Sequence, residues 1–168
     1  MLKADLGLLQ RRGRLEVEAQ VEPDDPLWAG SGVAPDGPLR VRLEVQQAGP
    51  DVVVRGRLQV DVALWCRRCL GPVRYAVDDE VTWLFRAGIS AAEAQAEEVF
   101  ALPERSRELD LAPAVREQLL LAVPEFVLCE EACRGLCPQC GANRNEDDCG
   151  CTAPVVDERW AALRRRPD

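Results

Sequence analysis

The sequence predicts an α+β fold, in which an antiparallel β-sheet or partly open barrel carries short helices and a C-terminal cysteine-rich, zinc-binding segment. Two observations lead to this prediction. Between residues 15 and 85, apolar and polar side chains alternate with a period of two, which is typical of antiparallel strands with one face in water. Between residues 129 and 151, cysteines recur at the short spacings that metal sites use.

Four strands are predicted in chain order, at residues 15–21, 39–45, 52–65 and 73–85. The stretch between the first two is rich in proline, glycine and acidic residues, so we expect a loop there, pinned to the body by Trp28. Gly56 interrupts the third strand and predicts a bulge. The last two strands are joined by a short turn and should form a hairpin.

Helices are expected after the strands, near residues 90–100 and 110–123 and, as a short final helix, from about residue 157 to 166. Ser90 and Glu93 have the spacing of a capping box, and Asp110 is the expected N-cap of the second helix. Trp160 and Leu163 should face inward from the last one.

We predict two parts that pack together as one unit. Residues 1–128 form the β-rich body with both longer helices, and residues 129–168 form the cysteine-rich zinc segment with the short C-terminal helix. A chain of 168 residues can bury a core of this kind without disulfides.

Composition narrows the class of protein. The sequence has no apolar run long enough to span a membrane and no signal-peptide pattern, so we expect a cytoplasmic protein with no membrane partner. It has no histidine, which excludes cysteine–histidine and serine–histidine catalytic pairs. The net charge of −8 argues against broad, nonspecific binding of nucleic acid.

All eight cysteines are predicted zinc ligands: Cys66, Cys69, Cys129, Cys133, Cys137, Cys140, Cys149 and Cys151. The first two lie at the hairpin tip in CRRC, and CPQCG at residues 137–141 has the form of a zinc knuckle. Tetrahedral zinc takes four such ligands, so eight thiolates predict two structural ions. Closed shells of four thiolates leave no place for a catalytic water, and no other catalytic motif stands out; the sequence therefore predicts no enzyme.

Two pairings of the cysteines remain open. The favoured one places the hairpin-tip pair with Cys129 and Cys133 and leaves the last four cysteines to a second site. The rival pairing joins the tip pair to Cys137 and Cys140, as in a zinc ribbon. Four disulfides, an iron–sulfur cluster and a redox dithiol at CRRC are less favoured, because the cytoplasm keeps thiols reduced and a redox pair usually lies at a helix N-terminus.

Four motifs carry a resemblance to a known family: CRRCL after a strand, LDLAPAVREQLLLAVP, LCEEACRGLCPQCGANRN with a following CGC, and DERWAALRR. Over about residues 58–165 the chain resembles the large ribosomal RNA subunit accumulation proteins (YceD-like). Arg144 departs from the family, which usually has leucine there. The resemblance implies a bacterial factor for the synthesis, processing or stability of 23S rRNA, and so for large-subunit biogenesis. It implies no enzymatic activity and no small-molecule substrate.

The expected partner is rRNA, a large-subunit assembly intermediate or a ribosomal protein. If residues 39–45 and 52–58 pair, four arginines share the wet face of the sheet and offer a contact for rRNA: Arg40, Arg42, Arg55 and Arg57. Alternatively, Glu16 and Glu18 on a neighbouring strand neutralise them. The excess of acidic residues lies after residue 70, which favours an alternative function as a zinc-stapled adaptor for a basic ribosomal protein or a nuclease.

Overall fold

The computed structural model describes residues 2–102, 106–152 and 159, which fall into two compact units. The first unit consists of Met1–Leu64 and Val73–Glu125, and the second of Trp65–Pro72 and Phe126–Asp168. The tip of the long hairpin therefore belongs with the cysteine-rich segment. That this segment packs on the body stays a prediction. The short helix predicted near residues 157–166, with Trp160 and Leu163, lies outside the described residues except for Arg159.

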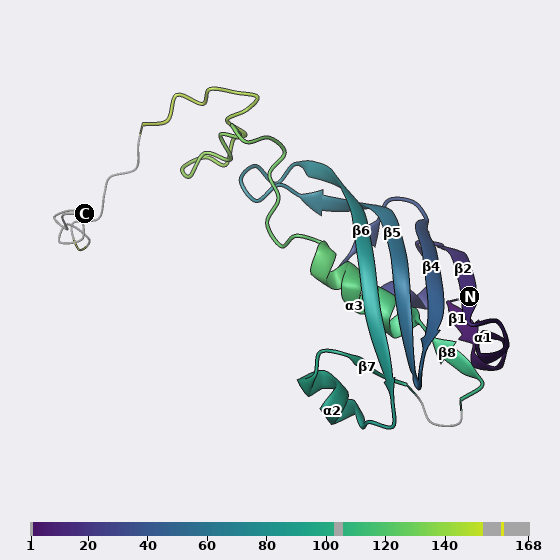
Figure 1. Ribbon diagram of the computed structural model, residues 1–168. Helices are drawn as coiled ribbons and strands as arrows, with labels where there is room; N and C mark the ends of the chain where they lie inside the picture. The colour runs from purple at the N-terminus through teal and green to yellow at the C-terminus, as the bar shows by residue number, and fades with distance from the viewer. Residues whose placement is uncertain (1, 103–105, 153–158, 160–168) are drawn as a thin grey trace. The chain divides into compact units, whose positions relative to one another are not determined.

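The main sheet of the first unit has six strands (Figure 1): β2 (Arg14–Val21), β3 (Ala34–Pro35), β4 (Leu39–Ala48), β5 (Asp51–Trp65), β6 (Pro72–Ala87) and β7 (Phe100–Leu102). Its order is β2–β4–β5–β6–β7, with β3 paired to β5. Strand β4 lies antiparallel to both β2 and β5, and β7 runs parallel to the end of β6. The predicted antiparallel sheet is confirmed, and it is open rather than closed into a barrel.

Gly56 does not mark a bulge, and that prediction is wrong. The register of β4 and β5 runs without a break through the pair Leu43 and Gly56. A glycine is needed for another reason, because an added Cβ would lie 2.0 Å from the carbonyl oxygen of Arg42 and 2.8 Å from the Cα of Leu43. The two strands approach so closely here that no side chain fits between their backbones.

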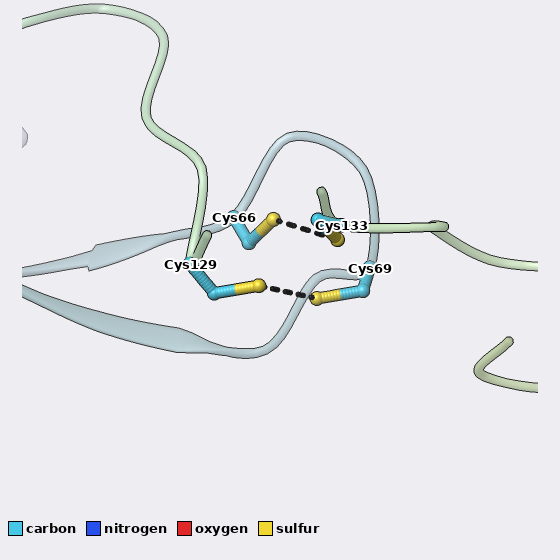
Figure 2. Close-up of side chains that lie close together, drawn as sticks. All are labelled: Cys66, Cys69, Cys129 and Cys133. Atoms are coloured by element: carbon cyan, nitrogen blue, oxygen red, sulfur yellow. Dashed lines mark hydrogen bonds between the residues drawn. The ribbon is translucent and has the colours of Figure 1, made fainter. Parts of the chain in front are cut away.

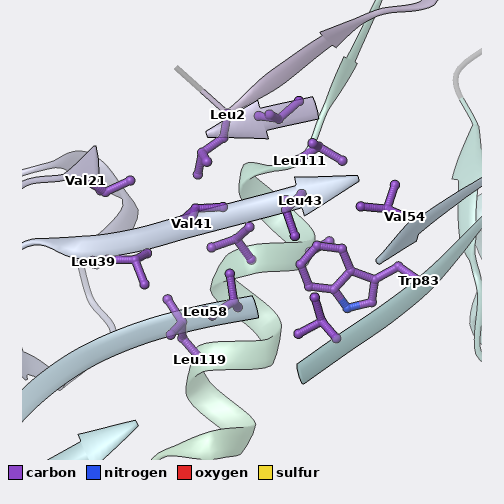
Figure 3. Close-up of a cluster of buried hydrophobic side chains, with 14 of the residues drawn as sticks. Leu2, Val21, Leu39, Val41, Leu43, Val54, Leu58, Trp83, Leu111 and Leu119 are labelled. Carbon is purple, nitrogen blue, oxygen red and sulfur yellow. The ribbon is translucent and has the colours of Figure 1, made fainter. Parts of the chain in front are cut away.

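Helix α3 (Ala112–Ala122) lies against one face of the main sheet (Figure 1). Its Leu119 packs in the core with Leu58 and Trp83 (Figure 3). The helix was expected from residue 110, but Leu111 occupies the N-cap position and has no side-chain cap. The carboxylate of Asp110 still accepts a hydrogen bond from the N–H of Ala112 at 3.0 Å, so it caps the helix from one residue earlier.

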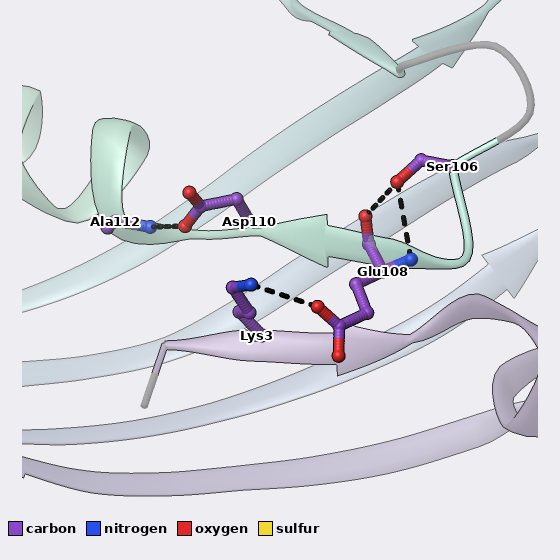
Figure 4. A network of polar contacts seen from close by, with 5 residues as sticks. All are labelled: Lys3, Ser106, Glu108, Asp110 and Ala112. Carbon is purple, nitrogen blue, oxygen red and sulfur yellow. Dashed lines mark hydrogen bonds and ion pairs between the residues drawn. The ribbon is translucent and has the colours of Figure 1, made fainter.

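A second, two-stranded sheet and the first helix of the chain were not predicted. Strand β1 (Lys3–Asp5) pairs antiparallel with β8 (Glu108–Asp110), and α1 (Leu6–Arg12) follows β1 at once. The ammonium group of Lys3 lies 2.9 Å from the carboxylate of Glu108 (Figure 4). The pairing closes the N-terminus onto the segment that leads into α3.

Two local predictions are confirmed. The helix expected near residues 90–100 is α2 (Ala91–Ala96), and Ser90 and Glu93 form its capping box. In the loop before β4, Pro26–Trp28 form a 3₁₀ turn, where Trp28 is buried and donates from Nε1 to the carbonyl oxygen of Glu22 at 3.0 Å. Within the described ranges, no helix is both long and apolar enough to cross a membrane.

Candidate metal centres

The eight cysteines form two groups of four in the second unit. Site 1 consists of Cys66, Cys69, Cys129 and Cys133, and site 2 of Cys137, Cys140, Cys149 and Cys151; within each group all sulfur atoms lie within 4.8 Å of one another, so each could hold a metal ion. This is the grouping that the sequence favoured, whereas the rival zinc-ribbon pairing is not the one in the structure. That these residues bind a metal stays a prediction.

The sulfur spacing in site 1 fits a tetrahedral ion (Figure 2). The sulfur atoms of Cys66 and Cys133 are 3.7 Å apart, and those of Cys69 and Cys129 are 3.6 Å apart. With metal–sulfur bonds of about 2.3 Å, the edge of a tetrahedron of thiolates is about 3.8 Å. A disulfide would need about 2.05 Å. The structure accordingly holds all eight cysteines as free thiols.

The first knuckle, residues 66–71, turns the hairpin tip around the sulfur of Cys66. The N–H of Cys66 donates to the carbonyl oxygen of Gly71 at 2.8 Å, and the N–H of Leu70 donates to that of Cys66 at 2.9 Å. The N–H of Arg68 points at the Cys66 sulfur, 3.4 Å away. Hydrogen bonds from backbone N–H groups, that of Cys69 first, lower the pKa of Cys66 to about 6 against the opposing effect of burial.

The second knuckle, residues 137–142, repeats this frame. The N–H of Cys137 donates to the carbonyl oxygen of Ala142 at 2.8 Å, and the N–H of Gly141 donates to that of Cys137 at 2.9 Å. Hydrogen bonds from the backbone of Cys140 and then Gln139 lower the pKa of Cys137 to about 6. Two segments with different side chains thus place a cysteine sulfur in the same backbone frame.

In each site the pKa of another thiol is raised instead. In site 1, a hydrogen bond with the Cys133 side chain and then burial raise the pKa of Cys129 to about 12. Hydrogen bonds with Cys140 and Cys149 likewise raise the pKa of Cys151 to about 12. Once one thiolate has formed, its neighbours resist a second negative charge. A divalent cation at the centre would remove this conflict, which is the chemistry expected of a four-thiolate metal site.

A short parallel bridge brings the other half of site 1 to the hairpin tip. Cys66 pairs with Val127, and the N–H of Arg67 donates to the carbonyl oxygen of Val127 at 2.9 Å. The turn at residues 130–133 then brings Cys133 to site 1. The guanidinium group of Arg68 donates to the carbonyl oxygens of Glu131 at 3.1 Å and Cys133 at 3.0 Å. Sequence reasoning assigned Arg68 no such role.

Asn145, which sequence reasoning also missed, connects the loop of site 2 to site 1. Its side-chain N–H group donates to the sulfur of Cys133 at 3.3 Å, and its side-chain oxygen accepts from the N–H of Arg134 at 2.7 Å. Close packing adds to the link, because a Cβ on Gly135 would lie 2.9 Å from the carbonyl oxygen of Arg68. The only sequence signal for Asn145 was its place in the ANRN motif.

Comparison with known proteins identifies the family. The sequence profile of the large ribosomal RNA subunit accumulation protein YceD matches residues 54–165, about two thirds of the chain. The chain belongs to the YceD family. An uncharacterised protein of Mycobacterium tuberculosis is 32% identical over 125 residues, which cover 74% of this chain and 60% of the relative. A protein of Mycobacterium leprae is 27% identical over 126 residues, 75% of this chain and 58% of the relative.

One similar protein carries the family name itself. The large ribosomal RNA subunit accumulation protein YCED homolog 1 of Arabidopsis thaliana chloroplasts is 30% identical over 67 residues, 40% of this chain and 21% of the relative. The chain spans about three fifths of the length of the mycobacterial relatives it matches. No solved structure matches it significantly.

The departure of this YceD-family chain at Arg144 has a simple explanation. The N–H of Arg144 donates to the carbonyl oxygen of Gly135 at 2.9 Å, while the side chain is exposed. Only the backbone of this residue holds the loop, so an arginine serves there as well as a leucine.

Two of the four arginines on the wet face of the main sheet pair with neighbouring acidic residues. Arg42 and Arg57 lie opposite each other on β4 and β5. Arg42 pairs with Glu18 on β2 at 3.8 Å, and Arg57 pairs with Asp78 on β6 at 2.6 Å. Each of these two arginines therefore has an acidic partner on the strand that flanks the β4–β5 pair. These contacts favour neutralisation of Arg42 and Arg57, with Glu18 but not Glu16 taking part. For Arg40 and Arg55 the described part of the chain shows no ion pair, so an rRNA-binding face there stays a prediction.

Proposed function

We propose that this protein is a non-enzymatic factor for the synthesis, processing or stability of 23S rRNA, and so for biogenesis of the large ribosomal subunit in the bacterial cytoplasm. The family match over residues 54–165 carries the proposal, since the family is named for accumulation of large-subunit rRNA. The name of the chloroplast relative supports it. The protein would act by binding rRNA, an assembly intermediate or a ribosomal protein.

We further infer that sites 1 and 2 each hold a structural zinc ion. Four sulfurs within 4.8 Å in each group match a ligand set that zinc prefers, and a chain without histidine offers no mixed cysteine–histidine set. Four thiolates fill the tetrahedral shell, so no position is left for a water or a substrate. The zinc ions would shape a binding surface rather than catalyse a reaction.

The function is tested by the ratio of mature 23S to 16S rRNA in a strain that lacks the gene, grown beside its parent. We expect a lower ratio, restored by the intact gene on a plasmid. An unchanged ratio would overturn the proposed function and leave only the structural role of the metal sites.

The zinc assignment has a separate test. Native mass spectrometry of the reduced, purified chain should show two zinc ions per molecule. A single zinc ion would mean that one of the two four-cysteine sites stays empty. A metal-free chain, or one with iron in place of zinc, would overturn the assignment.

A further inference from the structure

The second unit exposes several large apolar side chains close to site 1. The exposed fraction is 66% for Trp65, 60% for Leu70, 72% for Phe126 and 37% for Leu128. Single exposed apolar residues are common, but a group of them on two short segments joined by a backbone bridge marks an interaction surface. Elsewhere in the described chain, the large exposed apolar side chains are Leu120 and Leu121 on α3.

The bridge between Cys66 and Val127 sets most of this group side by side. Because the bridge is parallel, Trp65 lies level with Phe126, and Arg67 lies level with Leu128. Side chains alternate across a strand, so these four project from one face while Cys66, which is fully buried, points to the other. The guanidinium group of Arg67 lies 4.9 Å from the ring centre of Phe126, which confirms that they share a face. We call these four residues the bridge face.

Leu70 adds a second observation. It has a φ of 58°, a left-handed conformation that costs a leucine about 1–2 kcal/mol. Gly141 takes the same position in the second knuckle, with a φ of 76° and no such cost. Leu70 is mostly exposed and so gains little from burial in return. Strain of this kind is typical of functional positions, where a side chain is kept for what it contacts.

We propose that the bridge face, together with Leu70, docks a basic protein segment with apolar anchor residues, such as a ribosomal protein offers during large-subunit assembly. This inference rests on the proposed function and names its partner class. Tryptophan and arginine are the residue types that dominate binding energy in protein–protein interfaces. An aromatic pair with an arginine stacked beside it has that composition.

Charge favours a protein over RNA as the occupant. The sequence of the second unit has eight acidic and eight basic side chains, so two zinc ions in four thiolates each would give this unit a formal net charge of about −4. A polyanion such as RNA is repelled by this charge, whereas a basic polypeptide is attracted to it. Arg68 is not available for phosphate, because its guanidinium group donates to the backbone around Cys133.

Photo-crosslinking tests the partner class directly. A benzophenone amino acid replaces Phe126 in the zinc-loaded full chain, and the control carries it at Leu121, which is 74% exposed on α3. Each protein is mixed separately with the purified proteins and with the deproteinised 23S rRNA of large subunits from the same organism. We expect crosslinks from position 126 to one or a few ribosomal proteins, identified by mass spectrometry, and none from position 121. Crosslinks to rRNA alone, equal crosslinks from both positions, or none from either would overturn the proposal.

Complementation separates failure of this inference from failure of the proposed function. The strain that lacks the gene receives the wild-type gene, the double variant Trp65→Ser/Phe126→Ser, or the control Leu121→Ser. We expect the double variant to leave the 23S:16S ratio as low as in the deletion strain, and the control to restore it. Full rescue by a double variant would overturn the docking surface but not the function, whereas no defect in the deletion strain would overturn the function itself. Two zinc ions in the purified double variant would show that it folds.

Discussion

Replacement of Cys66 by serine should destabilise the first unit far more than replacement of Cys149. Each change removes one ligand and, with it, one zinc ion. The two sites differ in the length of chain that they close. Cys69 and Cys129 of site 1 are 60 residues apart in the sequence, and this loop contains all of β6 and all of α3. The thiols of site 2 lie within one short segment that contains no part of the first unit.

The magnitude follows from the entropy of loop closure. A cross-link that closes a loop of 60 residues removes entropy from the unfolded chain equivalent to about 4 kcal/mol at 25 °C. For a protein of this size, such a loss lowers the melting temperature by roughly 8–16 °C. The zinc of site 2 closes a loop outside the first unit, so its loss should leave the melting temperature of that unit almost unchanged.

Thermal unfolding monitored by far-ultraviolet circular dichroism measures the difference, because the long strands of the first unit dominate the signal. Both variants must first be shown by mass spectrometry to have lost one zinc ion. If Cys66→Ser and Cys149→Ser then melt at the same temperature, the entropic argument is refuted. If Cys149→Ser melts lower, the zinc of site 2 supports the first unit in a way that chain connectivity does not predict.

Three further substitutions test the structure at single residues. Gly56→Ala should lower the free energy of unfolding by about 3 kcal/mol in a urea titration, because its Cβ would lie 2.0 Å from a backbone oxygen. In the control Gly7→Ala in α1 the nearest atom to the new Cβ is the Asp5 carboxylate oxygen at 3.3 Å, so the free energy of unfolding should change by no more than about 1 kcal/mol. Leu70→Gly should raise stability by less than about 1 kcal/mol, since it removes the strain at a φ of 58°, and a loss of stability would contradict that strain. Asn145→Ala should weaken zinc binding at site 1 about tenfold, because the Asn145 amide donates to the sulfur of Cys133. A chelator competition should show this loss at site 1 and unchanged affinity at site 2; equal weakening at both sites would argue against the contact.

The long strands were predictable because each carries its own signal. Alternation of apolar and polar residues is local, and the observed strands β2, β4, β5 and β6 begin and end within three residues of the predicted ranges. The short strands β1 and β8 carry no such signal. Each has three residues, and the partners are far apart in the sequence, as in the pair Lys3 and Asp110. Such pairing depends on tertiary contact rather than on a pattern in either segment.

The candidate ligands were predictable for a similar reason, and their supporting residues were not. A cysteine spacing is local, and zinc needs four thiolates, so the count and positions predict two groups of four. They favoured the observed grouping but left the zinc-ribbon pairing open. Arg68 donates to the backbone oxygens of Glu131 and Cys133, and Asn145 donates to the sulfur of Cys133. Neither residue type is specific for that role. Gly56 was singled out for the wrong reason, because the sequence does not reveal how closely two strands approach.

One element builds both the metal site and the proposed docking surface. The bridge between Cys66 and Val127 turns Cys66 inward, where it meets the sulfur of Cys133 at 3.7 Å. The same alternation turns Trp65 and Phe126 outward. These aromatic side chains lie on segments about sixty residues apart in the chain, which are joined by this bridge and by the hydrogen bonds of Arg68 to the backbone of Glu131 and Cys133. A metal ion bound by thiolates from both segments would add a stronger constraint. This gives site 1 a function beyond stability: it would fix the two halves of a binding surface that neither segment could form alone.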